Sequence, residues 1–211
     1  MKNLIIIGTG GHARPVVDIA QSLPAFQSSQ LDVACIDTNY SGKDEDILGI
    51  PVIGGMDKLN TYSNTDTSIF VAVGDNLERK QIVTEVQALG YEISTLIHPT
   101  AIISAHSKIG NGSLVCAGAI LNPGVEIGEG CIINTGAIID HETIIGDFAH
   151  IAPGVKIAGR AKIGELAFIG IGSVIIDKIK IGAYATVGAA SVILDHVSEN
   201  ATVVGLHKKM K

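Results

Sequence analysis

The sequence predicts a small α/β domain followed by an all-β domain built from a six-residue repeat. Up to residue 96, strand and helix patterns alternate, which is typical of a parallel sheet with helical connections. From Ile97 to Ile193, every sixth residue is aliphatic. Four residues after each of these positions the side chain is almost always small. We therefore expect two domains, at 1–96 and 97–211.

The first domain starts with a short apolar strand and a glycine-rich turn. The helix that follows tolerates Pro15, because this proline lies in its first turn. A later helix ends at Gly90, a typical C-terminal cap. The polar segment Asn39–Asp46 is expected to form a mobile loop. We expect strands at Leu4–Ile7, Leu31–Ile36, Ile50–Ile53 and Ser68–Val73, helices at Ala13–Ser22, Met56–Tyr62 and Leu77–Leu89, and a segment Ile93–Ile97 that leads into the second domain. This order indicates a Rossmann-like parallel sheet.

The repeat of the second domain predicts a parallel β-helix. Three hexapeptides make one coil of about 18 residues, in which the aliphatic side chain fills the interior and the small one occupies a crowded corner. Successive coils then pair through parallel strands. The alternative, an ordinary parallel sheet with helical crossovers, is disfavoured because no helical period fits between the repeats.

Composition excludes several classes of protein. The formal net charge is −6 and no basic stripe or extended Lys- or Arg-rich run occurs, which argues against nucleic acid or an anionic membrane as a partner. No apolar stretch reaches the roughly 18 residues of a membrane helix, and the first apolar run is too short for a signal peptide. The three cysteines lack CxxC spacing, so we expect buried thiols in a reducing compartment and a cytoplasmic protein.

The glycine-rich turn at Gly8–Ala13 fits the pattern G-x-G-x-x-A. Such glycines let backbone N–H groups approach a phosphate at a helix N-terminus. An acidic residue, Asp37, ends the second strand, where it can bind a ribose hydroxyl. The turn is also compatible with no ligand, or with NAD. We favour a nucleotide-sugar site, because about three strands make only half of a dinucleotide-binding fold.

Among the seven histidines, His141 has the most suggestive surroundings. It lies between Asp140 and Glu142, and a carboxylate beside an imidazole gives it the tautomer and basicity of a general base. His150 follows nine residues later. Some β-helix enzymes bind zinc through three histidines of neighbouring coils, but no third histidine occupies a matching coil position here. We therefore expect no metal.

These motifs together resemble the NeuD/PglD-type family of sugar O- and N-acyltransferases, and most of all the UDP-4-amino-sugar N-acetyltransferases of the bacillosamine pathway. The resemblance covers nearly the whole chain. It rests on the segments Ile5–Arg14, Val73–Asn76, Leu96–Ala101, Ile133–Thr135, Asp140–Glu142 and Phe148–Ile151.

The resemblance implies a left-handed β-helix and a homotrimer whose active sites lie between neighbouring β-helices. It also implies roles for single residues. His141 would be the general base and Glu142 would raise its basicity. Asn134 is a weaker candidate for a sugar contact. The nucleotide sugar would contact Gly10, Gly11, His12, Asp37, Thr38 and Gly74, and acetyl-CoA would contact His150, Ile171 and Ala189.

The resulting hypothesis is direct acetyl transfer from acetyl-CoA to the 4-amino group of a nucleotide-linked amino sugar, in particular a UDP-4-amino-4,6-dideoxy-N-acetyl sugar. Three alternatives stay open. The chain could O-acetylate a sugar such as sialic acid, or N-acetylate a GDP- or dTDP-linked 4-amino sugar. It could also be a non-catalytic scaffold that binds a sugar nucleotide.

Overall fold

The structure is a computed structural model, which describes residues 2–42 and 45–208. The chain separates into two compact units, Met1–Pro99 and Thr100–Lys211. Part of the loop expected at Asn39–Asp46 and the last residues of the expected second domain lie outside the described residues. Within the described part, Asp46 belongs to a strand rather than to that loop.

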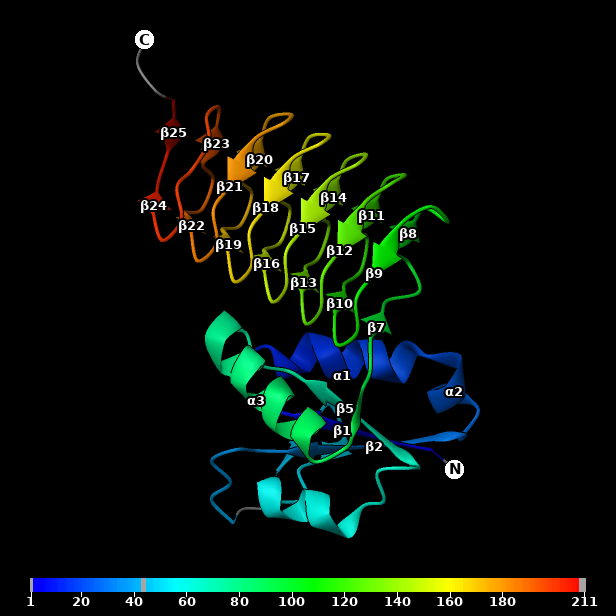
Figure 1. Ribbon diagram of the computed structural model, residues 1–211. Coiled ribbons are helices and arrows are strands. Elements are labelled where there is room, and N and C mark those ends of the chain that lie inside the picture. The colour runs from blue at the N-terminus through cyan, green and yellow to red at the C-terminus, as the bar shows by residue number, and fades with distance from the viewer. Residues whose placement is uncertain (1, 43–44, 209–211) are drawn as a thin grey trace. The chain divides into compact units, whose positions relative to one another are not determined.

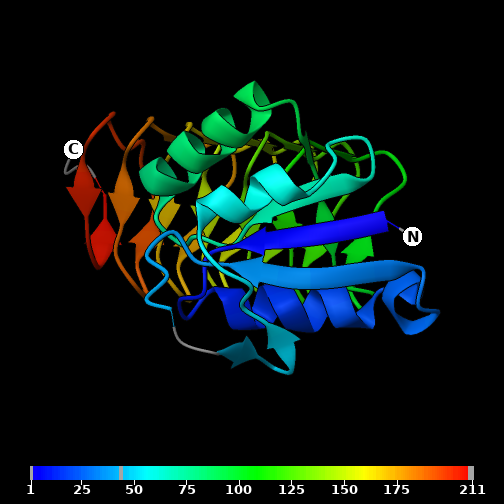
Figure 2. The same cartoon turned by 90° about the horizontal axis from the view of Figure 1, so that it is seen from below.

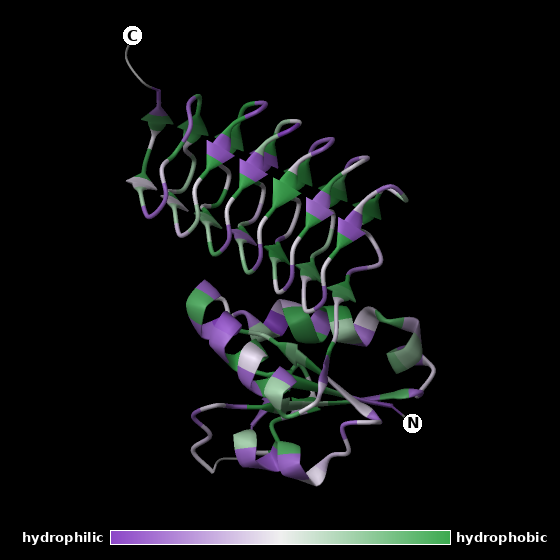
Figure 3. Cartoon of the chain, viewed as in Figure 1, coloured by the Kyte–Doolittle hydropathy of each residue, from purple (hydrophilic) through white to green (hydrophobic). Residues whose placement is uncertain are grey.

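Unit 1 contains a parallel four-stranded sheet in the order β2-β1-β5-β6 (Figure 2). Its central strands begin with polar residues, but their last residues, Leu4–Ile7 and Ile69–Val71, are apolar and buried (Figure 3). A separate antiparallel pair joins β3 to β4. The strands of unit 1 are β1 (Lys2–Ile7), β2 (Leu31–Ile36), β3 (Asp46–Ile47), β4 (Ile50–Pro51), β5 (Thr67–Val71), β6 (Glu92–Ile93) and β7 (Leu96–Ile97).

The helices of unit 1 cover this sheet. Helix α1 (Ala13–Ser22) contacts β1, and α3 (Asn76–Ala88) contacts β5 and β6. The carboxylate of Asp75 caps α3 by accepting a hydrogen bond from the Glu78 N–H at 2.8 Å. The described residues also include α2 (Pro24–Gln27) and the 3₁₀ helix η1 (Met56–Thr61).

The expected Rossmann-like sheet is confirmed, with corrections at its periphery. Helix α2 and strand β3 were not expected, because each is too short to show a period. The helix expected at Met56–Tyr62 is a 3₁₀ helix. Gly90 has φ +84° directly after α3, as a C-terminal cap requires.

Unit 2 is the expected left-handed parallel β-helix (Figure 1). Up to Ile193 its two-residue strands stack at an interval of 18 residues, as in the pairing of Ile120 with Ile138, whereas the last pairings, Thr186 with Thr202 and Val192 with Leu206, span fewer residues. The strands form three parallel sheets. The first contains β10 (Leu114–Val115), β13 (Ile132–Ile133), β16 (His150–Ile151), β19 (Phe168–Ile169), β22 (Thr186–Val187) and β24 (Thr202–Val203).

The other two sheets have the same construction. The second contains β8 (Ile102–Ile103), β11 (Ile120–Leu121), β14 (Ile138–Ile139), β17 (Lys156–Ile157), β20 (Val174–Ile175), β23 (Val192–Ile193) and β25 (Leu206–His207). The third contains β9 (Lys108–Ile109), β12 (Glu126–Ile127), β15 (Ile144–Ile145), β18 (Lys162–Ile163) and β21 (Lys180–Ile181).

Both lattices of the repeat line the interior of the β-helix. From Val115 to Ile193, every residue of the aliphatic lattice is buried. The small lattice is buried from Ser113 to Ser191, and Ala137 and Ala149 have no exposed surface. The repeat therefore fixes the core of this unit.

Candidate functional site

A cavity of about 500 Å³ lies in unit 1, where strands β1, β2 and β5 end. The carboxyl ends of parallel strands are the usual place for a ligand in such a sheet. All six residues predicted to contact a nucleotide sugar line this cavity: Gly10, Gly11, His12, Asp37, Thr38 and Gly74. The fold thus brings together three segments that are far apart in the sequence.

The glycines of the turn after β1 have different physical roles. Gly8 has φ +107°, and a Cβ atom there would lie 3.1 Å from the carbonyl oxygen of Ala72. Gly8 is therefore required by the backbone. Cβ atoms at Gly10 and Gly11 would meet no protein atom within 4 Å. These two glycines leave space in the cavity wall.

Asp37 is held in a fixed orientation where β2 ends. The hydroxyl of Thr9 donates a hydrogen bond to one carboxylate oxygen of Asp37. The backbone N–H of Asn39 donates to the other oxygen at 2.8 Å. The Thr9 bond ties the segment after β2 to the glycine-rich turn after β1, and the Asn39 bond fixes the carboxylate within its own segment.

A buried arginine shapes the third segment of the cavity wall. Arg79, at the start of α3, is 1% exposed and donates hydrogen bonds to the carbonyl oxygens of Val73 at 3.0 Å and Gly74 at 3.2 Å. Burial, followed by the charge of Arg79, lowers the pKa of His12 to about 4. His12 is therefore neutral at pH 7.

Sequence reasoning missed Arg79, although a signal was present. It occupies the apolar period of α3 together with Ile82, Val83 and Val86, all of which are buried. A charged residue in such a period must be paired or hydrogen-bonded inside the protein. That pattern predicts a structural arginine next to the strand end.

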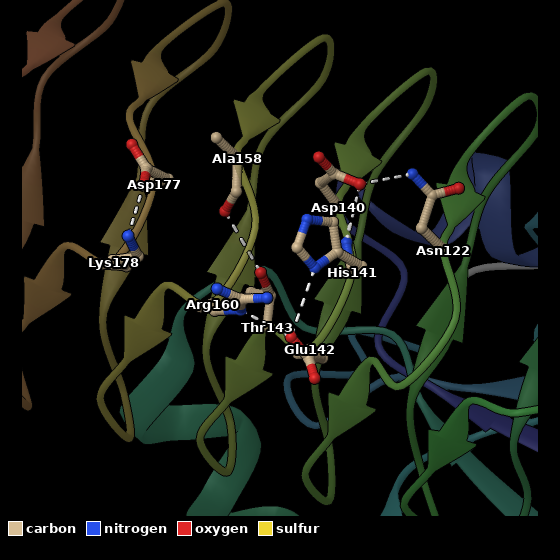
Figure 4. Close-up of polar contacts among 9 residues, drawn as sticks. All are labelled: Asn122, Asp140, His141, Glu142, Thr143, Ala158, Arg160, Asp177 and Lys178. Carbon is tan, nitrogen blue, oxygen red and sulfur yellow. Dashed lines mark hydrogen bonds and ion pairs between the residues drawn. The ribbon is translucent and has the colours of Figure 1, made fainter.

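In unit 2, His141 lies at an exposed turn that follows β14 (Figure 4). Its Nδ1 atom lies 3.4 Å from Oε2 of Glu142. The same oxygen accepts a hydrogen bond from Nε of Arg160 at 2.6 Å. Arg160 is the main cause, and His141 a smaller one, of the lowered pKa of Glu142. The predicted pair is thus a triad that includes one residue from the next coil.

The backbone of this turn is fixed by Asp140. One of its carboxylate oxygens accepts hydrogen bonds from the backbone N–H of His141 at 2.7 Å and from Nδ2 of Asn122 at 2.8 Å. These two bonds lower the pKa of Asp140. The carboxylate therefore supports the backbone, whereas Glu142 is the carboxylate that faces the imidazole ring.

The imidazole ring of His141 also packs against the next coil. A Cβ atom at Gly159 would lie 2.5 Å from Nε2 of His141. The ring therefore occupies the space that a side chain at this position would fill. Gly159 was not singled out from the sequence, because its neighbour becomes apparent only when the coils are stacked.

The three residues expected to contact acetyl-CoA follow one sheet of the β-helix. His150 lies on β16, whereas Ile171 and Ala189 follow β19 and β22, the next two strands of that sheet. The turns after β19 and β22 are joined by a hydrogen bond from Ala190 N–H to Ile171 O at 2.8 Å. Ile171 and Ala189 are exposed.

His150 itself is nearly buried, at 9% exposure. Its Nε2 atom lies 3.3 Å from Nδ2 of Asn134, and its ring makes an edge contact with Phe168 at a centroid distance of 5.2 Å. Asn134 and His150 therefore form one polar pair between neighbouring coils.

Within residues 2–42 and 45–208, no cluster of three or more His, Cys, Asp or Glu side chains is arranged to hold a metal ion. No helix in the same ranges is long and apolar enough to cross a membrane.

Comparison with known proteins identifies both parts of the chain. Residues 3–86 match the family model of the PglD N-terminal domain, and residues 106–141 match the bacterial transferase hexapeptide model of six repeats. The acetyltransferase domain of PglB from Neisseria gonorrhoeae FA1090, solved in complex with acetyl coenzyme A, is similar over the whole fold. It has 35% identity and a TM-score of 0.89, over 97% of this chain and 96% of that chain.

The chain belongs to the PglD-type family of hexapeptide-repeat sugar acyltransferases. Another similar structure is PerB from Caulobacter crescentus in complex with CoA and GDP-perosamine. It has 32% identity and a TM-score of 0.87, over 97% of this chain and 95% of that one. The UDP-N-acetylbacillosamine N-acetyltransferase of Bacillus subtilis (strain 168) is 33% identical over 120 residues, which is 56% of this chain. The match covers 52% of the length of that curated relative.

Proposed function

We propose that this PglD-type chain transfers the acetyl group of acetyl-CoA to the amino group of a nucleotide-linked amino sugar. The observation that carries the proposal is the His141–Glu142 pair on an exposed β-helix turn, in a chain that also has a ligand-sized cavity in its α/β unit. Relatives whose structures hold acetyl coenzyme A, or CoA with GDP-perosamine, support the two co-substrates. The 4-amino group of a UDP-4-amino-4,6-dideoxy-N-acetyl sugar is the proposed acceptor position.

The proposed mechanism is direct transfer with His141 as the general base. The amine nitrogen attacks the thioester carbonyl, the C–S bond breaks, and CoA leaves as a thiolate. His141 takes the proton that the nitrogen loses and can pass it to the thiolate. The Nδ1 contact with Glu142 orients the ring so that Nε2 can accept this proton. Holding the two co-substrates together supplies much of the remaining acceleration.

We assign the binding residues as follows. Gly10, Gly11, His12 and Gly74 surround the diphosphate region, and Asp37 with Thr38 contacts the nucleoside. His150, Ile171 and Ala189 line the path of acetyl-CoA along the β-helix. We also propose a homotrimer in which neighbouring subunits complete each site. Its molar mass in solution would be three times that of the chain.

A GDP-linked amino sugar is the second candidate acceptor, because the Caulobacter relative was solved with GDP-perosamine. A panel of UDP-, GDP- and dTDP-linked 4-amino sugars, with sialic acid as an O-acetylation acceptor, separates the candidates by thiol release from acetyl-CoA. Sugar-nucleotide binding without thiol release from any acceptor would favour the non-catalytic scaffold.

The decisive variant is His141→Ala. We expect turnover to fall by about two to four orders of magnitude, the usual contribution of a general base. Oligomeric state and CoA binding should be unchanged, because His141 is exposed and its ring is not part of the core. A His141→Ala protein with nearly unchanged turnover at neutral pH would refute the assignment of the base.

A further inference from the structure

Three stacked turns of the β-helix form a column: His141–Glu142, Gly159–Arg160 and Asp177–Lys178. The N–H of Arg160 donates to the carbonyl of His141 at 2.9 Å, and the N–H of Lys178 donates to the carbonyl of Gly159 at 3.0 Å. The second residue of each turn has a left-handed backbone, with φ +57° at Glu142, +59° at Arg160 and +60° at Lys178. The turns therefore share one backbone geometry, so their side chains can be compared directly.

In the middle turn of the column, glycine comes first and arginine second, which is the reverse of the order that the backbone favours. Glycine is preferred at the position with positive φ, yet Gly159 stands first and Arg160 takes the left-handed conformation. An L-residue there costs about 1 kcal/mol. The first position does not need glycine, because His141 and Asp177 occupy it in the neighbouring turns.

Both departures are explained by the turn that carries His141. Gly159 leaves room for the imidazole, since a Cβ atom there would lie 2.5 Å from Nε2. Arg160 reaches back across the coil and donates to Oε2 of Glu142 at 2.6 Å, the oxygen that lies 3.4 Å from Nδ1 of His141. A protonated imidazole and the guanidinium would therefore compete for one oxygen atom.

The other charged groups of this region are Asp140, Asp177 and Lys178, together with Lys156, which lines a hollow with Asp140 and Ala158. Asp140 accepts from the backbone N–H of His141 and from Asn122. Asp177 lies one coil beyond Arg160 and pairs with Lys178 at 3.5 Å. The stacked turn on the opposite side consists of Pro123 and Gly124, which carry no charge.

We propose that Arg160 is a positioning residue that holds the Glu142 carboxylate and offsets its charge, so that the imidazole of His141 stays neutral at working pH. This proposal rests on the assignment of His141 as the base. The carboxylate orients the ring, but alone it also favours the protonated imidazole, which cannot accept a proton. The guanidinium remains charged at every relevant pH, so the offset is constant.

The direct test measures the protonation of His141 by NMR. The Cε1–H signal of His141 is assigned by its loss in His141→Asn. We expect Arg160→Met to move the pH dependence of this signal to higher pH, because the carboxylate of Glu142 then acts on the imidazole without the opposing charge of the guanidinium. Arg160→Lys should restore most of the wild-type pH dependence. Lys178→Met is the matched control, with the same φ and charge change one coil further away, and should have no effect.

The kinetic test uses the acidic limb of kcat/KM against pH. Arg160→Met should move this limb to higher pH, which lowers kcat/KM about threefold below the limb and leaves the high-pH plateau in place. Glu142→Gln should move the limb to lower pH. In the Glu142→Gln background, Arg160→Met should cause a smaller shift, because the carboxylate no longer holds the guanidinium beside the imidazole.

Three results would overturn the proposal: an unchanged His141 titration in Arg160→Met, an equal shift in Lys178→Met, or a full shift that persists in Glu142→Gln. Because the NMR titration needs no turnover, it separates this proposal from the proposed function. A His141→Ala protein with normal activity would remove the base, whereas the titration would still report whether Arg160 offsets Glu142.

Discussion

At the scale of the residue, the glycine-rich turn contains two kinds of glycine. Gly8 serves the backbone, because its φ of +107° and its approach to Ala72 leave no room for a side chain. Gly10 serves the cavity, because a Cβ atom there would meet no protein atom within 4 Å. The pattern G-x-G-x-x-A contains both kinds and does not distinguish them.

Gly8→Ala should therefore affect the stability of the protein, and Gly10→Ala the binding of a nucleotide sugar. We expect Gly8→Ala to lower the free energy of unfolding by about 1–3 kcal/mol, measured by urea titration. Gly10→Ala should keep nearly wild-type stability and weaken the binding of a nucleotide sugar about tenfold or more, measured by calorimetry. Unchanged nucleotide-sugar binding by a stable Gly10→Ala protein would argue that the turn does not cradle the diphosphate.

At the scale of the element, the small lattice of the β-helix includes serines that bond between coils. The hydroxyl of Ser113 is fully buried, donates to the carbonyl of Gly128 at 2.9 Å and accepts from the N–H of Cys131 at 3.0 Å. Ser107 precedes it by one hexapeptide and donates to the carbonyl of Asn122 at 3.0 Å, but is only half-buried.

Ser113→Ala should destabilise the protein by about 1–3 kcal/mol, because it removes the partners of a buried N–H and a buried carbonyl. Ser107→Ala is the matched control and should cost less than about 1 kcal/mol, since water can replace its hydroxyl. Chemical denaturation followed by circular dichroism measures both values. Equal losses for the two variants would contradict the role of burial.

At the scale of the whole molecule, the three cysteines are free thiols buried in the two units. Burial raises the pKa of Cys35 to about 11 and that of Cys116 to about 12. The thiol of Cys131 donates to the carbonyl of Gly146 at 3.1 Å. The thiolate is the reactive form, so these groups should be unreactive while each unit stays folded.

We expect the native protein to react only slowly with iodoacetamide at pH 8, whereas all three thiols should react rapidly in denaturant. Peptide mass spectrometry then assigns each modification. Because Cys35 lies in unit 1 and the other two lie in unit 2, the denaturant dependence of labelling reports the opening of each unit separately. Rapid labelling of Cys116 in buffer would contradict the buried position of this thiol.

Much of this molecule was predictable because its period is exact. A six-residue repeat without insertions places each aliphatic residue inside and each small residue at a corner, as the burial of Ile139 and Ala137 confirms. The residues around the cavity were also predictable, because parallel strands end at one edge of the sheet. Short elements such as α2 were missed, since four residues show no period.

The sequence by itself determined the two-part architecture, the family and the position of His141 beside Glu142. Only the tertiary structure decided which side chains meet between coils and inside the α/β unit. Arg160 reaches Glu142 across 18 residues, Gly159 lies beside the imidazole, and Arg79 binds the carbonyls of Val73 and Gly74. The physical reason is that periodicity fixes where the backbone stacks, whereas the direction of a side chain depends on the space and partners that folding provides.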